Sequence, residues 1–425
     1  MLTLPFTQVL QGVLKRRIFK NFLSLTFYQI ANYIFPLVTI PYLSRVLGAE
    51  KFGLVMFAHS LILYFNILTD YGFNLSAVRE IAVHADNNKK IWEIFNSVVL
   101  IKLAFVILTF FILLFLISFF DKFNADYKVY LFAFPAVLGQ SLFPIWFFQG
   151  MQQMKYITYF SIITKLTYIV LIFTFVKNSS DYLLVPLFNS VSAIGSGVLT
   201  FLISVYNFKL KIYIPSFEKI KFYLIDGWYV FLSQVSMQLF NSANILLLGL
   251  LADNKSVAYF AGADKIIKAF NYLAVPIVNA IFPYVGGLFK RSKNEAFKFL
   301  KVIIRTFAPI FLTVSLFIFI FSEKICIVFL GEEFTNSSAV LRILSLVPFF
   351  VFMNNIFGTQ ILINLGCKRN YAMVFIISGV FNIVLIMLLV WKFKYIGVAI
   401  SSFFAEFIVV SGMYYFAKKE GFKIL

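Results

Sequence analysis

Residues 96–120 read NSVVLIKLAFVILTFFILLFLISFF, an apolar run that holds a single charged side chain, Lys102. A helix rises about 1.5 Å per residue, so about 20 apolar residues are enough to cross the hydrocarbon core of a bilayer. The run is therefore long enough for one complete crossing. It predicts a membrane-spanning helix.

The rest of the 425-residue chain has the same character. Hydrophobic residues make up 61% of it and charged residues 13%, whereas soluble domains contain roughly 45–50% apolar and about 25% charged residues. This composition excludes a soluble globular enzyme. The runs that predict spanning helices are 21–43, 53–74, 96–120, 128–149, 156–176, 182–206, 228–251, 257–288, 301–321, 340–364, 371–391 and 395–417. We predict an all-α integral membrane protein with about twelve transmembrane helices.

The basic residues are distributed unevenly between the two sides of the predicted membrane. The net charge of +19 comes from 37 Lys and Arg against 18 Asp and Glu. With the N-terminus inside, the cytoplasmic segments hold 22 of the basic residues and the opposite side holds 9. Cytoplasmic loops of multi-pass proteins are enriched in Lys and Arg, so this bias predicts that both termini are cytoplasmic. It also explains the net charge, and no nucleic-acid partner is expected.

Two features indicate a chain built from two halves. The longest predicted cytoplasmic break, Asn207–Lys221, holds four lysines and one proline. A basic turn led by a glycine follows the fourth predicted helix of each half, at Gly150 and at Gly366. We predict two six-helix bundles, residues 1–210 and 211–425, in a duplicated, transporter-like fold. No connection exceeds roughly 20 residues, so none forms a separate catalytic domain, and the protein is not expected to be an enzyme.

Metal-ligating residue types are scarce. The chain has two cysteines, Cys326 and Cys367, and two histidines, His59 and His84, all far apart in the sequence. A structural metal site normally needs three or four clustered ligands. We predict no metal and no cofactor.

Six charged residues fall deep inside predicted spans. They are Lys102, Lys165, Asp264, Lys265, Lys268 and Glu406. A charge near the bilayer centre costs about 2.5–3.5 kcal/mol on insertion scales, so such groups usually face a wet cavity or a partner. One interpretation is structural: lysines snorkel to the interface, and Asp264 pairs with Lys268 four residues along the same helix face. The other is a cationic central cavity that binds an anionic substrate, with Lys102, Lys165, Lys265 and Lys268 as candidates.

Further candidates lie near helix ends and at prolines. Asp70 and Asn74 share a helix face, and Arg79 continues towards the cytoplasm. Prolines inside spans kink their helices, and the pair Pro36 and Pro41 is the best hinge candidate.

Several of these stretches resemble a known family. NYIFP at residues 32–36, PYLSRVLG at 41–48, DYGFN at 70–74 with Arg79-Glu80, and PIWFFQG at 144–150 closely resemble the bacterial polysaccharide transporter family of O-antigen flippases. The length, helix number and two-half layout are similar too. The specific motifs lie in the first 160 residues, and the second half agrees mainly in topology.

The resemblance implies two six-helix bundles around a central cavity that work by alternating access, in the superfamily that includes multidrug and toxin extruders. It implies translocation of undecaprenyl-pyrophosphate-linked oligosaccharide repeat units across the cytoplasmic membrane, for O-antigen or other surface polysaccharides. Membrane lipid, a polysaccharide polymerase and chain-length proteins are the implied partners. By motif position it supports Arg45 and Arg79 as substrate-binding cations. An ion gradient is the expected energy source, with Asp70, Asp264 and Glu406 as candidate coupling acids.

Two alternatives remain open at this stage. A multidrug or small-cation exporter of the same fold would favour acids over lysines in its cavity. A membrane polysaccharide polymerase or glycosyltransferase is the other, although the short loops argue against it because such active sites need extramembrane loops or domains.

Overall fold

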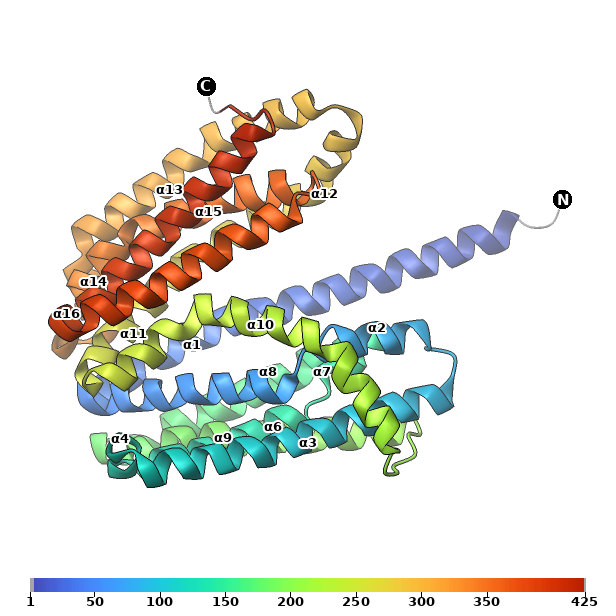
Figure 1. Ribbon diagram of the computed structural model, residues 1–425, viewed down its shortest axis with the longest axis horizontal. Helices are drawn as coiled ribbons and strands as arrows, with labels where there is room; N and C mark the ends of the chain where they lie inside the picture. Colours follow the sequence, from blue (N-terminus) through green and yellow to red (C-terminus); the bar gives the residue numbers. More distant parts are fainter. Residues whose placement is uncertain (1–3, 424–425) are drawn as a thin grey trace. The chain divides into compact units, whose positions relative to one another are not determined.

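The computed structural model describes the backbone of residues 4–423, and the side chains of residues 27–423 apart from 30, 33, 233 and 236–242. Every regular element in this part of the chain is a helix. The longer helices are α1 (Leu4–Asp70), α3 (Asn88–Phe119), α8 (Met154–Phe175), α9 (Leu184–Asn207), α10 (Phe217–Leu251), α11 (Asn254–Asn271), α12 (Ala274–Arg291), α13 (Lys293–Leu330) and α16 (Lys368–Lys419) (Figure 1). The shorter ones are α2 (Ser76–Val83), α4 (Asp121–Ala125), α5 (Tyr127–Ala133), α6 (Pro135–Leu142), α7 (Ile145–Gly150), η1 (Ser179–Leu183), η2 (Glu332–Phe334), α14 (Ser337–Ile343), η3 (Leu344–Leu346), α15 (Val347–Asn354) and the π-helix η4 (Asn355–Ile363).

The chain packs into two compact units that are not continuous in sequence. Unit 1 consists of Met1–Thr39 and Leu61–Val235, and unit 2 of Ile40–Ser60 and Ser236–Leu425. Helices α1 and α10 therefore contribute residues to both units. The division into bundles 1–210 and 211–425 stays a prediction, and each of the two units combines two separate stretches of the chain.

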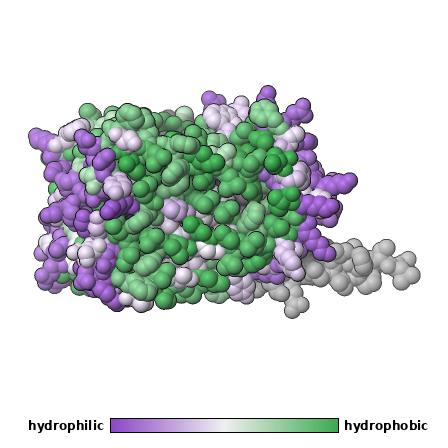
Figure 2. All heavy atoms as spheres, turned by 90° about the horizontal axis from the view of Figure 1, so that it is seen from below, coloured by the Kyte–Doolittle hydropathy of each residue, from purple (hydrophilic) through white to green (hydrophobic). Residues whose placement is uncertain are grey.

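The all-helical membrane architecture is confirmed. In the described part of the chain, nine helical runs are long and apolar enough to cross a membrane. Large apolar side chains on α3 remain exposed, among them Ile107, Phe111 and Phe119. Figure 2 shows a broad band of apolar side chains on one face, with hydrophilic side chains gathered at its two ends. Such a band matches the hydrocarbon core between two headgroup layers. Twelve crossings and cytoplasmic termini remain predictions.

Two of these nine runs each contain two of the spans predicted from the sequence. In α16 the break is at Lys394, where φ is 46°. The limbs on either side pack against each other in opposite directions: Ser378 Oγ donates to the carbonyl of Ala405 at 2.6 Å, and Val374 lies against Gly412. The element is therefore a helical hairpin and not one long rod (Figure 1).

The corresponding break in α1 is at Gly48, where φ is +69°. That backbone conformation is costly for residues with a side chain. The next residue begins a new helical limb, and its N–H, on Ala49, donates to Glu333 Oε2 at 2.9 Å. The carboxylate thus satisfies an otherwise free donor at a helix start. The hinge candidates Pro36 and Pro41 lie in α1 before this break, and their hinge role stays a prediction.

Small residues bring α6 and α9 into direct backbone contact within unit 1. A Cβ added at Gly139 would lie 2.4 Å from the backbone of Ala193, and one added at Gly197 would lie 2.2 Å from the carbonyl of Gly139. The N–H of Ala136 in α6 also donates to Ser190 Oγ of α9 at 3.1 Å. Helices in lipid associate mainly through such close packing, because lipid tails are as apolar as leucine. These contacts hold α6 and α9 together within unit 1.

A charged cap orders the turn between α10 and α11 in unit 2. The Asp253 carboxylate accepts from the backbone N–H of Ser256 at 2.8 Å and from Lys394 Nζ at 2.8 Å. Although burial opposes ionisation, these bonds lower the pKa of Asp253 to about 2. The ionised form is therefore the one that the fold stabilises.

Asp253→Asn is expected to keep the cap and remove the charge, so that stability falls by about 0.5 kcal/mol at pH 7, as for other solvent-screened pairs. The folded-state pKa of about 2 lies below the ordinary value of 3.8. The stabilisation is then complete above about pH 4 and is lost as the pH falls towards about 2. Melting temperatures of the two purified proteins should converge over that range. A difference independent of pH would contradict the prediction.

Candidate functional site

Lys102 and Asp70 form a buried ion pair in unit 1. Lys102 Nζ donates to Asp70 Oδ1 at 2.8 Å, and the lysine side chain is 2% exposed. Asn74 Nδ2 donates to Asp70 Oδ2 at 3.3 Å. Lys102 is a predicted substrate-binding cation because of its depth in the membrane, and Asp70 is a candidate coupling acid. The structure pairs them, so each neutralises the charge of the other.

An aromatic stack holds Asp70 in place. The helix ends there because Tyr71 and Gly72 both have positive φ, 44° and 78°. The Tyr71 ring stacks on Phe105 and on Phe231, with centroid distances of 5.1 and 4.9 Å. Asp70 is therefore the last residue of α1, directly before a turn whose Tyr71 ring packs between α3 and α10.

Arg79 also has acidic partners. One guanidinium nitrogen lies 2.9 Å from Asp226 Oδ1 and 3.2 Å from Glu80 Oε1. Asp226 and Glu80 raise the pKa of this exposed arginine above its ordinary value. The group joins α2 to α10 within unit 1, and an anionic substrate would have to compete with two carboxylates for it.

Lys165 differs from these cations because its partner is neutral. It lies half-buried on α8 and donates to the amide oxygen of Asn32. Its ammonium group is also 5.7 Å from the centre of the Phe35 ring. An amide positions a lysine without cancelling its charge. Among the residues that the structure describes, Lys165 forms no ion pair with an acidic side chain.

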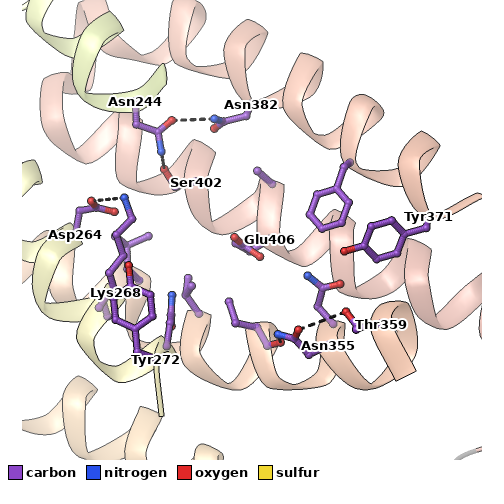
Figure 3. Close-up of a pocket in the computed structure, with 18 residues that line it drawn as sticks. Asn244, Asp264, Lys268, Tyr272, Asn355, Thr359, Tyr371, Asn382, Ser402 and Glu406 are labelled. Atoms are coloured by element: carbon purple, nitrogen blue, oxygen red, sulfur yellow. Dashed lines mark hydrogen bonds and ion pairs between the residues drawn. The ribbon is translucent and has the colours of Figure 1, made fainter. Parts of the chain in front are cut away.

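A cavity of about 360 Å³ lies within unit 2. Residues from α10, α11, η3, α15, η4 and α16 line it (Figure 3). Asn244, on α10, accepts from Asn382 Nδ2 and donates to Ser402 Oγ, both at 2.8 Å. On the opposite wall, Asn355 and Thr359 of η4 are within 3.5 Å of each other. The wall of the cavity is thus rich in amide and hydroxyl groups.

Three of the predicted charged residues meet at this cavity. Asp264 and Lys268, one turn apart on α11, form an ion pair of 2.8 Å, as their spacing predicts. Glu406 of α16 points towards the middle of the cavity (Figure 3). Within the described part of the chain, its carboxylate makes no hydrogen bond. The described lining of the cavity therefore contains two acids and one lysine. The cationic central cavity that the sequence predicts is a different site and remains a prediction.

The remaining candidates lie elsewhere. Lys265 is half-buried on α11 but does not line the cavity of unit 2. Arg45 is exposed and donates to the carbonyl of Val328 at the end of α13. The motif that contains Arg45 thus anchors the chain near the break at Gly48.

The sequence reasoning missed the asparagines. Those that line the cavity are Asn244, Asn271, Asn354, Asn355 and Asn382. All lie inside or next to apolar runs, where an uncharged amide is less conspicuous than a charge. A search for carboxamides within predicted spans would have found them, because polar groups in a membrane seek partners.

Comparison with known proteins shows what the chain is similar to. Residues 18–289 match the family described as polysaccharide biosynthesis protein. The "Putative O-antigen transporter" of Escherichia coli (strain K12) is 30% identical over 402 residues, which are 94% of this chain and 97% of that protein.

Two solved structures have the same fold. The lipid II flippase MurJ in an inward closed conformation superposes with a TM-score of 0.71 at 17% identity, covering 92% of this chain and 87% of that one. A multidrug resistance MATE family transporter in an inward-facing conformation gives 0.69 at 16% identity, covering 93% and 98%.

Proposed function

The chain belongs to the polysaccharide biosynthesis protein family, and from this membership we propose that it is a flippase for lipid-linked oligosaccharides. It would move undecaprenyl-pyrophosphate-linked repeat units across the cytoplasmic membrane by alternating access, for O-antigen or another surface polysaccharide. The observation that carries the proposal is the relationship to the Escherichia coli protein over nearly the whole length of both chains.

The physical task agrees with the side chains described above. A pyrophosphate and several sugars must cross about 30 Å of hydrocarbon, while the polyprenyl tail can remain in lipid. Polar groups that cross hydrocarbon need replacements for the hydrogen bonds they make with water. The amides of the unit 2 cavity and the charge of Lys165 are groups of the required kind.

We assign different roles to the candidate residues. Lys165 is our first choice for contact with the pyrophosphate, because its partner is neutral. Lys102 and Lys268 each have an acidic partner, so we assign them to stabilising the fold and not to direct contact with the substrate. Glu406 is our first choice as a coupling acid, because Asp70 and Asp264 are already in ion pairs.

The wider assignments follow from the proposed role. The protein would reside in the cytoplasmic (inner) membrane, with a polysaccharide polymerase and chain-length proteins acting on the translocated unit. Its relatives are named as transporters and flippases, and we propose no catalytic activity.

One observation favours a second function. The unit 2 cavity holds two carboxylates against one lysine, together with the rings of Tyr371 and Phe375. Acids and aromatic faces are suited to organic cations. Export of small cationic compounds is therefore the alternative.

Deletion of the gene distinguishes the two functions. We expect a completed, lipid-linked repeat unit to accumulate on the cytoplasmic face of the membrane, with loss of the surface polymer and recovery on complementation. Polyprenyl-linked saccharides would be extracted and tested for access by a membrane-impermeant glycosidase. Normal surface glycan with new sensitivity to cationic drugs would overturn the flippase proposal in favour of export.

A further inference from the structure

We propose that the cavity of unit 2 binds a single neutral sugar ring. This inference rests on the proposed function, since it assigns to this cavity the recognition of one residue of the translocated oligosaccharide. It concerns a site formed entirely by unit 2, between α10, α11, α15, η4 and α16.

The size of the cavity limits the ligand. Small-molecule sites usually enclose about 300–1,000 Å³, and this cavity, at about 360 Å³, is at the lower end. A single pyranose fits in such a volume, whereas a whole repeat unit does not. The cavity would thus bind one sugar of the repeat unit, and the other sugars would remain outside it.

The lining has hydrogen-bond acceptors that lack donors. The amide oxygens of Asn271 and Asn382 are buried without a hydrogen bond in the structure, and Asn382 is 1% exposed. The Glu406 carboxylate lines the same space and accepts from no described residue. A buried acceptor without a donor is energetically unfavourable. A ligand with several hydroxyl donors on one small frame would satisfy these groups together.

The apolar part of the lining distinguishes a sugar from a simple ion. Tyr371 presents its ring to the cavity (Figure 3). Phe375, Val347 and Val351 line it as well. An inorganic cation gains nothing from such walls, because it requires converging oxygen ligands. A pyranose combines two kinds of group. Its C–H faces pack on aromatic rings, and its equatorial hydroxyls form hydrogen bonds with amides.

The charges oppose an acidic ligand. Among the described residues of the lining, Lys268 is the single cation, and it is 2.8 Å from Asp264, so its charge is already balanced. When Glu406 is ionised, the described lining carries a net negative charge. A phosphate or a uronic acid would meet this charge in a medium that screens it poorly. The site should therefore select neutral sugars.

Binding by the full-length protein in nanodiscs tests the proposal. The probes are the methyl glycosides of glucose, galactose, N-acetylglucosamine and glucuronic acid, at up to roughly 50 mM, which covers the weak affinities of small polar ligands. We expect saturation-transfer NMR signals from at least one neutral glycoside, and a dissociation constant for the glucuronide at least 10-fold weaker. Absence of signal from all three neutral glycosides would overturn the proposal.

Variants connect binding to this cavity. Asn382→Leu should weaken the binding of the neutral glycoside by roughly 10-fold, which corresponds to the loss of one or two hydrogen bonds. Glu406→Gln should strengthen the binding of the glucuronide, so that its dissociation constant approaches those of the neutral sugars. Damage to the fold cannot produce such a gain in affinity. The control is Asn364→Ala, which removes an amide from the segment after η4 and outside the cavity lining. Equal effects from the control would place binding elsewhere.

A cation and a transport assay separate this proposal from the one it rests on. If tetraphenylphosphonium binds in a Glu406-dependent manner, the glycosides do not bind and the unaltered protein does not flip lipid-linked oligosaccharide, both the sugar site and the flippase are overturned. If Asn382→Leu flips lipid-linked oligosaccharide as well as the unaltered protein does, the sugar site is wrong and the flippase stands.

Discussion

Lys102→Met is expected to lower the free energy of unfolding by about 3 kcal/mol, because it leaves the Asp70 carboxylate without its buried partner. Methionine is close to lysine in length and fills the same space on α3. The loss therefore comes from the uncompensated charge and not from a hole in the packing. It lies at the lower end of the range for buried pairs because Asp70 remains 20% exposed. Denaturant unfolding of the detergent-solubilised protein measures it.

The double variant Asp70→Asn/Lys102→Met provides the control. With both charges gone, most of the lost stability should return, because neutral pairs of similar volume often replace buried ion pairs at little cost. The Asn74 amide, which donates to Asp70, can donate in the same way to the amide oxygen of an asparagine at residue 70. If the double variant is stable and still transports, Lys102 acts on the fold. If it is stable and inactive, Lys102 or Asp70 contributes directly to transport, which would contradict our assignment.

This pair shows what sequence patterns can and cannot reveal. The pairing of Asp264 with Lys268 follows from a four-residue spacing on one helix, and the structure contains it. Asp70 and Lys102 are 32 residues apart on different helices. Both lie at sites that hydropathy identifies as unusual, but hydropathy does not show which unusual residues meet. Their contact depends on the turn at Tyr71 and Gly72, a tertiary feature.

The unit 2 cavity was less accessible to prediction. Its amides come from segments as distant as Asn244, Asn355 and Asn382, and none of them carries a charge. A hydropathy profile averages an asparagine with its apolar neighbours, so the run still predicts a span. Glu406 was found because its insertion cost is large. Its position beside Asp264 and Lys268 required the packing of α11 against α16. The sequence thus predicts which residues are costly in a membrane better than it predicts the cavity that accommodates them.

Gly48 illustrates the same limit for the fold. The stretch around it predicts a short turn between two spans, and the structure has a break in α1 there. What the local pattern lacks is Glu333, whose carboxylate accepts from the N–H of Ala49 at 2.9 Å. A residue almost three hundred positions away completes the turn. Arg45 similarly bonds to Val328, so the motif is partly structural.

Lys165→Gln is expected to reduce transport by roughly 10- to 100-fold, because a hydrogen bond between charged groups contributes about 1.5–3 kcal/mol. Among the paired cations described above, Lys165 is distinguished by a neutral partner, Asn32, so its charge remains available to a pyrophosphate. Glutamine keeps a hydrogen-bond donor near Asn32 and removes only the charge. Reconstituted vesicles with a fluorescent lipid-linked oligosaccharide would report the rate at which the label leaves the outer leaflet.

Two matched variants decide whether the charge or the fold is responsible. Lys155→Gln removes an exposed lysine from the first turn of the same helix, where the ammonium group lies over the Tyr156 ring. It should transport like the unaltered protein. Lys165→Arg keeps the positive charge and should retain most of the rate, since a guanidinium also binds phosphate. If Lys165→Gln is as active as Lys155→Gln, the pyrophosphate is bound by other groups. If Lys165→Arg is as inactive as Lys165→Gln while both melt normally, the site requires the shape of lysine and not its charge alone.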